Sequence, residues 1–183
     1  MKENLRAQKL LERLEHHPEE KKQKDEKIIK RITQLPEFEK AKVVLFYISF
    51  RGEVDLEQLF VRYHSTKKFV LPRVNGENLD LYAIQNWSDT EVGSFQIPEP
   101  LPDLPNVMLS EIDLVLIPGI AFSHNGHRIG YGRGFYDRLL KKLACPKIGI
   151  AYDFQIVKNI PGELHDVPMD TVVTESLELR INN

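Results

Sequence analysis

Short apolar runs alternate with amphipathic segments through most of the chain, and this alternation restricts the possible folds more than any other feature. Residues 43–48 form a continuous β-branched and aromatic run, and residues 113–117 and 147–151 form two shorter, mainly apolar runs. Such runs are typical of strands that are buried on both faces. Residues 55–64 and 135–143 instead have the apolar spacing of helices. The pattern predicts an α/β fold with three layers, in which helices flank a largely parallel, mixed sheet.

The rest of the chain extends this prediction. Further strands are expected at residues 68–74, 79–84, 171–174 and 177–181. Residues 86–110 contain four prolines and little periodicity, so they are expected to be mostly loop. A chain of 183 residues fits one domain better than two. We therefore expect a single domain, residues 1–183, in which a helical segment at 1–35 packs on an α/β core at 43–181.

The N-terminal segment is expected to form two helices. Pro18 breaks the first helix and suits the first turn of the second, which Pro36 ends. Four leucines are expected to share one face of the first helix: Leu5, Leu10, Leu11 and Leu14. Ten Lys and Arg against seven Asp and Glu give this segment a net charge of +3, so the remainder of a chain of charge −2 carries −5.

Charge and cysteine content exclude several classes of protein. A formal charge of −2 argues against general nucleic-acid binding. The single cysteine, Cys145, excludes a disulfide framework and a zinc site built from cysteines. No apolar run approaches the roughly 20 residues of a membrane span, and the N-terminus lacks the apolar core of a signal peptide. We therefore expect a cytoplasmic protein without membrane or nucleic-acid partners, either a monomer or a weak homodimer.

A glycine-rich segment follows the strand expected at 113–117. Five of the ten glycines fall within residues 119–134, directly before a predicted helix. Gly130, Gly132 and Gly134 stand at alternate positions, where the absence of side chains lets backbone N–H groups approach an anion. In a parallel α/β sheet, ligands bind beyond the carboxyl ends of the strands. This placement predicts an anion site, although a flexible surface loop is the alternative.

Charged residues in the same segment favour the anion site. Arg128 and Arg133 carry the planar guanidinium groups that bind phosphate in a bidentate way. Asp137 follows in the first turn of the expected helix, and a carboxylate beside a polyanion makes sense where magnesium bridges the two. The spacing matches neither the P-loop nor the dinucleotide-binding fingerprint.

Several motifs stand in order along nearly the whole chain. They are Lys-Glu-Asn-Leu-Arg at residues 2–6, the strand end and Glu53 at 47–55, Ile-Pro-Glu-Pro at 97–100, the glycine-rich segment at 118–137 and the run at 165–175. Together they resemble the 5-formyltetrahydrofolate cyclo-ligase family, also called 5,10-methenyltetrahydrofolate synthetase. Two positions depart from the family pattern: Ser123 stands where many members have Asp, and Phe135 where many have Tyr.

The resemblance implies an enzyme that cyclises 5-formyltetrahydrofolate to 5,10-methenyltetrahydrofolate. ATP is the implied co-substrate and Mg2+ the implied cofactor, with ADP and phosphate released through a phosphorylated N5-formyl imidate intermediate. One alternative is a related ATP-dependent enzyme of the same fold that acts on another folate- or thiamine-pathway substrate. A non-catalytic module whose basic N-terminal helix binds RNA is a third possibility, which the local charge of only +3 disfavours.

By position, the resemblance also assigns residues to sites. The implied ATP-binding residues are Lys2, Arg6, Arg128, Gly130, Tyr131, Gly132, Arg133, Gly134, Phe135 and Tyr136. The implied substrate-binding residues are Ile48, Glu53, Tyr131, Gly132, Arg133, Gly134 and Phe135. The implied metal ligands are Asp137 and Asp170, and the implied catalytic residues are Arg128, Arg133 and Lys2.

Each assignment has a simpler structural alternative. Lys2 and Arg6 fit solvated helix charges, and Asp170 fits a turn residue. Glu53 fits a residue that precedes or caps a helix, whereas a folate-binding role would use its carboxylate to accept two N–H bonds from an amino-pyrimidinone edge. His124 and His127 are interpreted as loop histidines because no third metal ligand is evident.

Overall fold

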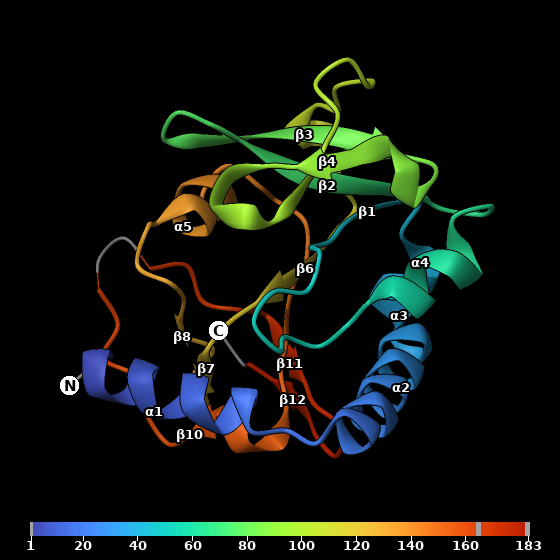
Figure 1. Ribbon diagram of the computed structural model, residues 1–183. Helices are drawn as coiled ribbons and strands as arrows, with labels where there is room; N and C mark the ends of the chain where they lie inside the picture. Colours follow the sequence, from blue (N-terminus) through green and yellow to red (C-terminus); the bar gives the residue numbers. More distant parts are fainter. Residues whose placement is uncertain (1, 164–165, 182–183) are drawn as a thin grey trace.

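The computed structural model describes residues 2–163 and 166–181. Within them, a seven-stranded mixed sheet forms the centre of the molecule, in the order β12-β11-β9-β6-β1-β2-β3 (Figure 1). Its strands are β1 (Val43–Leu45), β2 (Lys68–Asn75), β3 (Asn78–Ile84), β6 (Leu114–Pro118), β9 (Lys147–Ile150), β11 (Thr171–Val173) and β12 (Glu178–Arg180). The five inner strands are parallel, while β3 and β12 pair antiparallel at the two edges. The predicted α/β fold with a largely parallel mixed sheet is confirmed.

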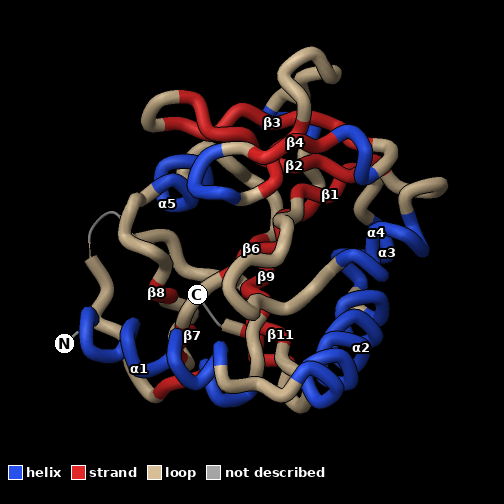
Figure 2. The backbone as a smooth tube through the Cα atoms, viewed as in Figure 1, coloured by secondary structure: helices blue, strands red, loops and turns tan. Residues whose placement is uncertain are grey.

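Helices cover both faces of this sheet. They are α1 (Lys2–Leu14), α2 (Pro18–Gln34), α3 (Pro36–Lys40), α4 (Glu57–Tyr63) and α5 (Phe135–Leu140). Figure 2 shows α2, α3 and α4 on one side of the sheet and α5 on the other. Ile28 and Phe60 pack with Leu116 in one apolar cluster, whereas Leu139 packs with Ile117 in a second. Neighbouring residues of β6 thus point to opposite faces, as strands buried on both sides require.

Prolines begin two of the helices. Pro18 stands at the start of α2, as predicted, because the first turn of a helix needs no N–H from that position. Pro36 was expected only to end the second helix, but it also begins the short helix α3. Among the described helices, none has the length and apolarity that crossing a membrane would need.

The predicted apolar face of α1 is wrong for two of its four leucines. Leu11 and Leu14 are 61% and 55% exposed, whereas Arg13 between them is only 1% exposed. Leu5 does pack against a small apolar cluster that includes Ile120 and Ile129. The helix therefore turns a charged side chain, rather than a leucine face, towards the rest of the protein.

Other differences concern short elements. Residues 86–110, expected to be mostly loop, contain a hairpin of β4 (Thr90–Val92) and β5 (Pro98–Pro100). A three-stranded sheet that was not expected joins β7 (Ala121–Ser123), β8 (Arg128–Ile129) and β10 (Ile156–Val157). The first strand ends at Leu45 rather than at residue 48, and α5 ends at Leu140 rather than at 143. Short 3-10 turns lie at Trp87–Asp89, Ser94–Gln96, Leu109–Glu111 and Asp153–Gln155.

Candidate active site

A cleft of about 830 Å³ opens beyond the carboxyl ends of β1 and β6. This is where ligands bind in parallel α/β sheets, and the volume lies in the range of small-molecule sites. Segments from across the chain line the cleft: the residues that follow β1, the end of β6, the glycine-rich loop, the start of α1 and the β4–β5 hairpin. Every residue predicted to bind ATP or folate lines it.

The glycine-rich loop has the backbone that its sequence predicts. Gly132 and Gly134 have φ values of +90° and +67°, which residues with a Cβ rarely adopt. Gly134 is the N-cap of α5, so the loop leads directly into the helix. At Gly130, an added Cβ would meet nothing within 4 Å, so this position leaves open space above the backbone. The predicted order of strand, glycine loop and helix is therefore present.

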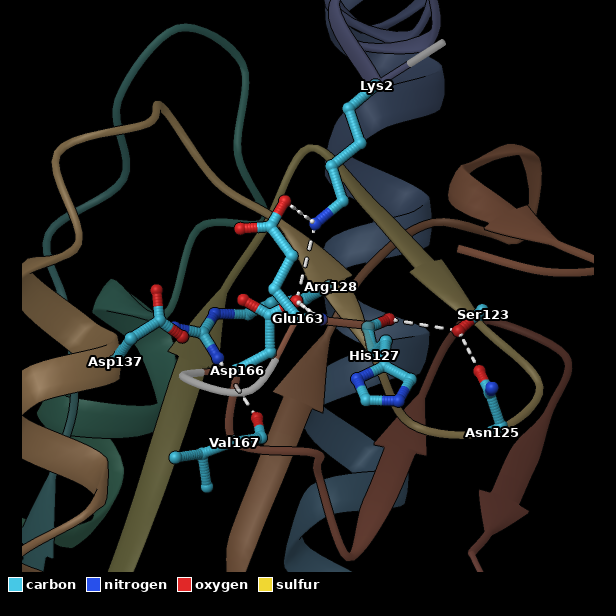
Figure 3. A network of polar contacts seen from close by, with 9 residues as sticks. All are labelled: Lys2, Ser123, Asn125, His127, Arg128, Asp137, Glu163, Asp166 and Val167. Carbon is cyan, nitrogen blue, oxygen red and sulfur yellow. Dashed lines mark hydrogen bonds and ion pairs between the residues drawn. The ribbon is translucent and has the colours of Figure 1, made fainter. Parts of the chain in front are cut away.

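The N-terminal helix reaches this loop, although more than 120 residues separate them in sequence. Arg6 Nε donates a hydrogen bond of 2.9 Å to the carbonyl of Gly130. Lys2 Nζ extends from α1 to Glu163 Oε1 at 2.8 Å and Asp166 Oδ2 at 3.3 Å (Figure 3). The hydrogen bond to Glu163 raises the pKa of Lys2. The structure thus brings together two of the segments that the sequence assigned to one site.

Arg13, which was not predicted, does not itself line the cleft but contacts three residues that do. Its Nε donates to the carbonyl of Arg51 at 2.9 Å, its Nη1 to the carbonyl of Gly119 at 3.0 Å and its Nη2 to the Tyr131 hydroxyl at 2.5 Å. Its Nη1 also lies 3.9 Å from Glu53 Oε1. Arg13 therefore joins α1 to three segments that line the cleft. A signal was present in the sequence, because positions 2, 6 and 13 share one face of a helix and all three are basic.

Glu53 lies deep in the cleft and is only 5% exposed. Burial raises the pKa of its carboxyl group to about 7, although the nearby Arg13 guanidinium acts to lower it. Its Oε2 accepts a hydrogen bond of 3.0 Å from the backbone N–H of Phe50. Burial, together with the negative charge of Glu53, raises the pKa of Tyr131 to about 12. Glu53 precedes α4, but the N-cap of that helix is Leu56, so Glu53 does not cap it.

The two predicted metal ligands lie in different places. Asp137 lines the cleft, and its Oδ1 accepts a hydrogen bond of 2.8 Å from Arg128 Nη2 (Figure 3). Asp170 lies outside the cleft, just before β11, where its Oδ2 accepts a hydrogen bond of 2.7 Å from the backbone N–H of Lys147. Because β9 begins at Lys147, this carboxylate sits at the amino end of the sheet, not at the ligand-binding end. The structure therefore places Asp137 but not Asp170 among the residues that line the cleft, and metal binding by either residue stays a prediction.

The β4–β5 hairpin closes one side of the cleft against the glycine loop. The Arg133 guanidinium carbon lies 4.0 Å from the centre of the Phe95 ring, a cation–π contact. Phe135 lies near the same ring, with 6.4 Å between the ring centres. Burial raises the pKa of Tyr136 above its usual range. The sequence assigned Arg133 and Phe135 to the site but did not identify the hairpin whose Phe95 contacts both.

Ser123, one of the two departures from the family pattern, is the buried last residue of β7. Its hydroxyl contacts Asn125 Oδ1 and lies 3.2 Å from the carbonyl oxygen of His127 (Figure 3). The residue therefore bonds within its own turn rather than in the cleft. His127 packs against Gly162, and no group of three potential metal ligands occurs among the described residues. His165, for which the sequence suggested no role, lies outside the described residues.

Comparison with known proteins finds the same family that the sequence motifs resemble. Residues 1–175 match the model of the 5-formyltetrahydrofolate cyclo-ligase family. The chain is 32% identical over 167 residues to the 5-formyltetrahydrofolate cyclo-ligase of Escherichia coli K12, covering 87% of this chain and 92% of the relative. It is 33% identical over 156 residues to the enzyme of the same name from Haemophilus influenzae, covering 80% and 83%.

Two solved structures are similar along almost their whole length. The 5,10-methenyltetrahydrofolate synthetase of Aquifex aeolicus, solved by NMR, superposes with a TM-score of 0.91 at 38% identity and covers 100% of this chain and 93% of that one. The 5,10-methenyltetrahydrofolate synthetase of Mycoplasma pneumoniae gives a TM-score of 0.80 at 26% identity, with coverage of 96% and 99%.

Proposed function

Because this chain belongs to the 5-formyltetrahydrofolate cyclo-ligase family, we propose that it cyclises 5-formyltetrahydrofolate to 5,10-methenyltetrahydrofolate, with ATP as the co-substrate. The observation that carries the proposal is the cleft itself. It combines a glycine-rich loop and cationic side chains, which suit phosphates, with the buried carboxylate of Glu53, which suits the N–H groups of a pterin. We also propose that residues 1–183 form one domain, since both apolar clusters pack on the same sheet.

The phosphates of ATP are proposed to bind between the glycine loop and α1. Lys2, Arg6, Arg128 and Arg133 line the cleft and would offset the phosphate charge. In the first step, the formyl oxygen attacks the γ-phosphorus, the bond to the bridging oxygen breaks, and ADP leaves. Phosphoryl transfer of this kind needs positioning and charge stabilisation rather than a protein nucleophile. Lys2, Arg128 and Arg133 are the proposed catalytic residues.

The folate is proposed to bind beside Glu53. Its amino-pyrimidinone edge would donate N–H bonds to this carboxylate, and such donors favour the ionised form. Ile48, Tyr131 and Phe135 supply the surfaces around the ring. In the second step, N10 attacks the carbon of the phosphorylated formyl group and loses its proton. The carbon–oxygen bond then breaks, phosphate leaves, and the methenyl bridge remains.

Asp137 fits the one-carboxylate role that magnesium has at many phosphate sites. Such an ion usually binds one or two carboxylates, the substrate phosphates and several waters. Asp137 lines the cleft next to the glycine loop, with a side chain that is 24% exposed. We propose that it would hold Mg2+, which neutralises phosphate charge when bound. Asp170 has no part in this proposal, because its carboxylate bonds to the backbone at the far end of the sheet.

A direct assay tests the proposed function. The purified protein is incubated with 5-formyltetrahydrofolate and MgATP, and the absorbance of the methenyl product is followed. We expect product only when both ATP and Mg2+ are present. Absence of product from folded protein over a broad pH range would overturn the proposal. A parallel panel of other folate and thiamine-pathway substrates, read by ADP release, distinguishes a related enzyme of the same fold.

A further inference from the structure

The motif Ile-Pro-Glu-Pro at residues 97–100 has no role in the site described so far. Its glutamate, Glu99, lies in β5, is only 6% exposed and lines the cleft. Within the described part of the chain, no hydrogen bond or ion pair reaches its carboxylate. The Glu99 oxygens are not among the fully buried, unpartnered polar atoms of the described residues, so they are open to the cleft. A carboxylate in this position is suited to accept a hydrogen bond from a donor group on a bound ligand.

The surroundings of Glu99 hold its side chain in place. Pro98 and Pro100 flank it and restrict the backbone to an extended conformation. The side chain lies against Gly93, which follows β4. A Cβ added at Gly93 would come within 2.4 Å of the Glu99 Cγ and Cδ atoms. Gly93 has an ordinary φ of −100°, so the glycine is needed here for space rather than for backbone conformation. The hairpin thus presents a carboxylate in a defined position.

Arg73, the cationic residue beside the hairpin, already has partners within the protein. Arg73 on β2 donates to the carbonyl of Pro100 at 2.6 Å and pairs with Glu91 Oε1 at 2.9 Å. Glu91 stands directly opposite Glu99 in the β4–β5 hairpin, but it does not line the cleft. The two glutamates therefore differ: Glu91 has a protein partner, and Glu99 faces the ligand space.

The position of Glu99 in the cleft indicates which part of a ligand it meets. The cationic groups come mainly from α1 and the glycine loop, and Arg133 of that loop also reaches Phe95 between β4 and β5. The strand β5 itself packs on β2 and β3, whose Leu71, Val74 and Leu79 line the same cleft. Phosphate is repelled by a carboxylate and is attracted to the cationic side. The group beside Glu99 is therefore an uncharged, largely apolar part of a substrate that carries an N–H donor.

We propose that Glu99 accepts a hydrogen bond from an N–H group of the bound reduced folate and so helps to select this substrate. The inference rests on the proposed function. A reduced folate carries N–H donors on its amino-pyrimidinone ring and also along its arylamine portion, so two carboxylates, Glu53 and Glu99, can each bind a different part. Adenine offers only its exocyclic amino group, which makes the nucleotide the less suitable partner.

The test compares Glu99→Gln with wild type and with Glu91→Gln, which removes the same charge from the opposite position of the hairpin. Calorimetry measures the dissociation constants of 5-formyltetrahydrofolate and of ADP for each protein. A charge-assisted hydrogen bond is worth about a 10- to 100-fold change in affinity. We expect Glu99→Gln to weaken folate binding by about this factor while ADP binding stays within about twofold. Glu91→Gln is expected to bind both ligands as wild type does.

A second variant alters the position of Glu99 without changing charge. Gly93→Ala occupies the space of the Glu99 side chain, so we expect the same selective loss of folate affinity. If Glu99→Gln binds folate like wild type, or loses ADP affinity instead, the inference is wrong. If wild type converts 5-formyltetrahydrofolate and Glu99→Gln shows no folate defect, only this inference fails. If wild type neither binds nor converts the folate, the proposed function fails with it.

Discussion

Glu53 links the stability of the protein to pH, and Glu53→Gln measures that link. The carboxyl group is 5% exposed, and burial raises its pKa from 4.5 to about 7. The nearest guanidinium, that of Arg13, lies 3.9 Å away and makes its hydrogen bonds to other groups. The protein therefore holds a carboxylate where the neutral form is favoured, a condition typical of residues that bind or react with a ligand.

The magnitude follows from the pKa difference. Each pKa unit corresponds to about 1.4 kcal/mol, so a rise from 4.5 to about 7 amounts to about 3 kcal/mol. Between these two pH values, the folded protein binds a proton that the unfolded chain has released. The free energy of unfolding therefore decreases as pH rises through this window. Glutamine at position 53 removes the titration and should abolish this contribution.

Urea unfolding of wild type and Glu53→Gln at pH 5 to 8 measures the difference. We expect the variant to gain about 2–3 kcal/mol relative to wild type between pH 5 and pH 8, because the contributions of all other groups cancel. Glu26→Gln, on the exposed face of α2, is the matched control and should follow wild type within about 0.5 kcal/mol. If the curves of Glu53→Gln and wild type run parallel over this range, Glu53 does not titrate as described.

Three further substitutions test other parts of the site. Arg13→Met removes the counter-charge of Glu53 and three hydrogen bonds, so unfolding experiments should show a loss of about 3–5 kcal/mol. Asp137→Ala should abolish turnover while the thermal melting curve stays close to that of wild type; wild-type rates at saturating magnesium would contradict the proposed metal role. Gly132→Ala forces a Cβ on to a φ of +90°, so we expect a loss of about 1–3 kcal/mol in unfolding and weaker ADP binding by calorimetry. Unchanged stability of Gly132→Ala would show that the loop relaxes freely.

The central sheet could be predicted because its strands are long enough and apolar enough to show in the sequence. Residues 114–117 are continuously apolar, and Asn75-Gly76, a pair typical of turns, stands at the junction of β2 and β3. The strands of the small sheet have only two or three residues, too few for any period to appear. In β5, two prolines argued against a strand, but the two-stranded hairpin with β4 tolerates them.

The site was predictable where one continuous segment carries it and not where distant segments meet. The glycine loop could be recognised from the spacing of its glycines. Gly132 and Gly134 have positive φ values, which favour glycine at these positions. Asp170 was assigned by position in a motif, but its neighbour in space is Lys147, which only the pairing of β9 with β11 brings there. The burial of Glu99 could not be predicted from the sequence either, because it depends on how the hairpin packs on β2 and β3.

Arg13 shows why helical periodicity alone misplaced the buried face of α1. Leucines at positions 11 and 14 remain exposed, so apolar burial contributes little to holding this end of the helix. The attachment comes instead from a guanidinium that reaches in three directions, to the carbonyls of Arg51 and Gly119 and to the Tyr131 hydroxyl. A lysine ammonium, a single point charge, lacks the fixed fork that serves three such acceptors at once. Because all three partners belong to segments around the cleft, the same bonds that hold α1 in place also determine the shape of the site.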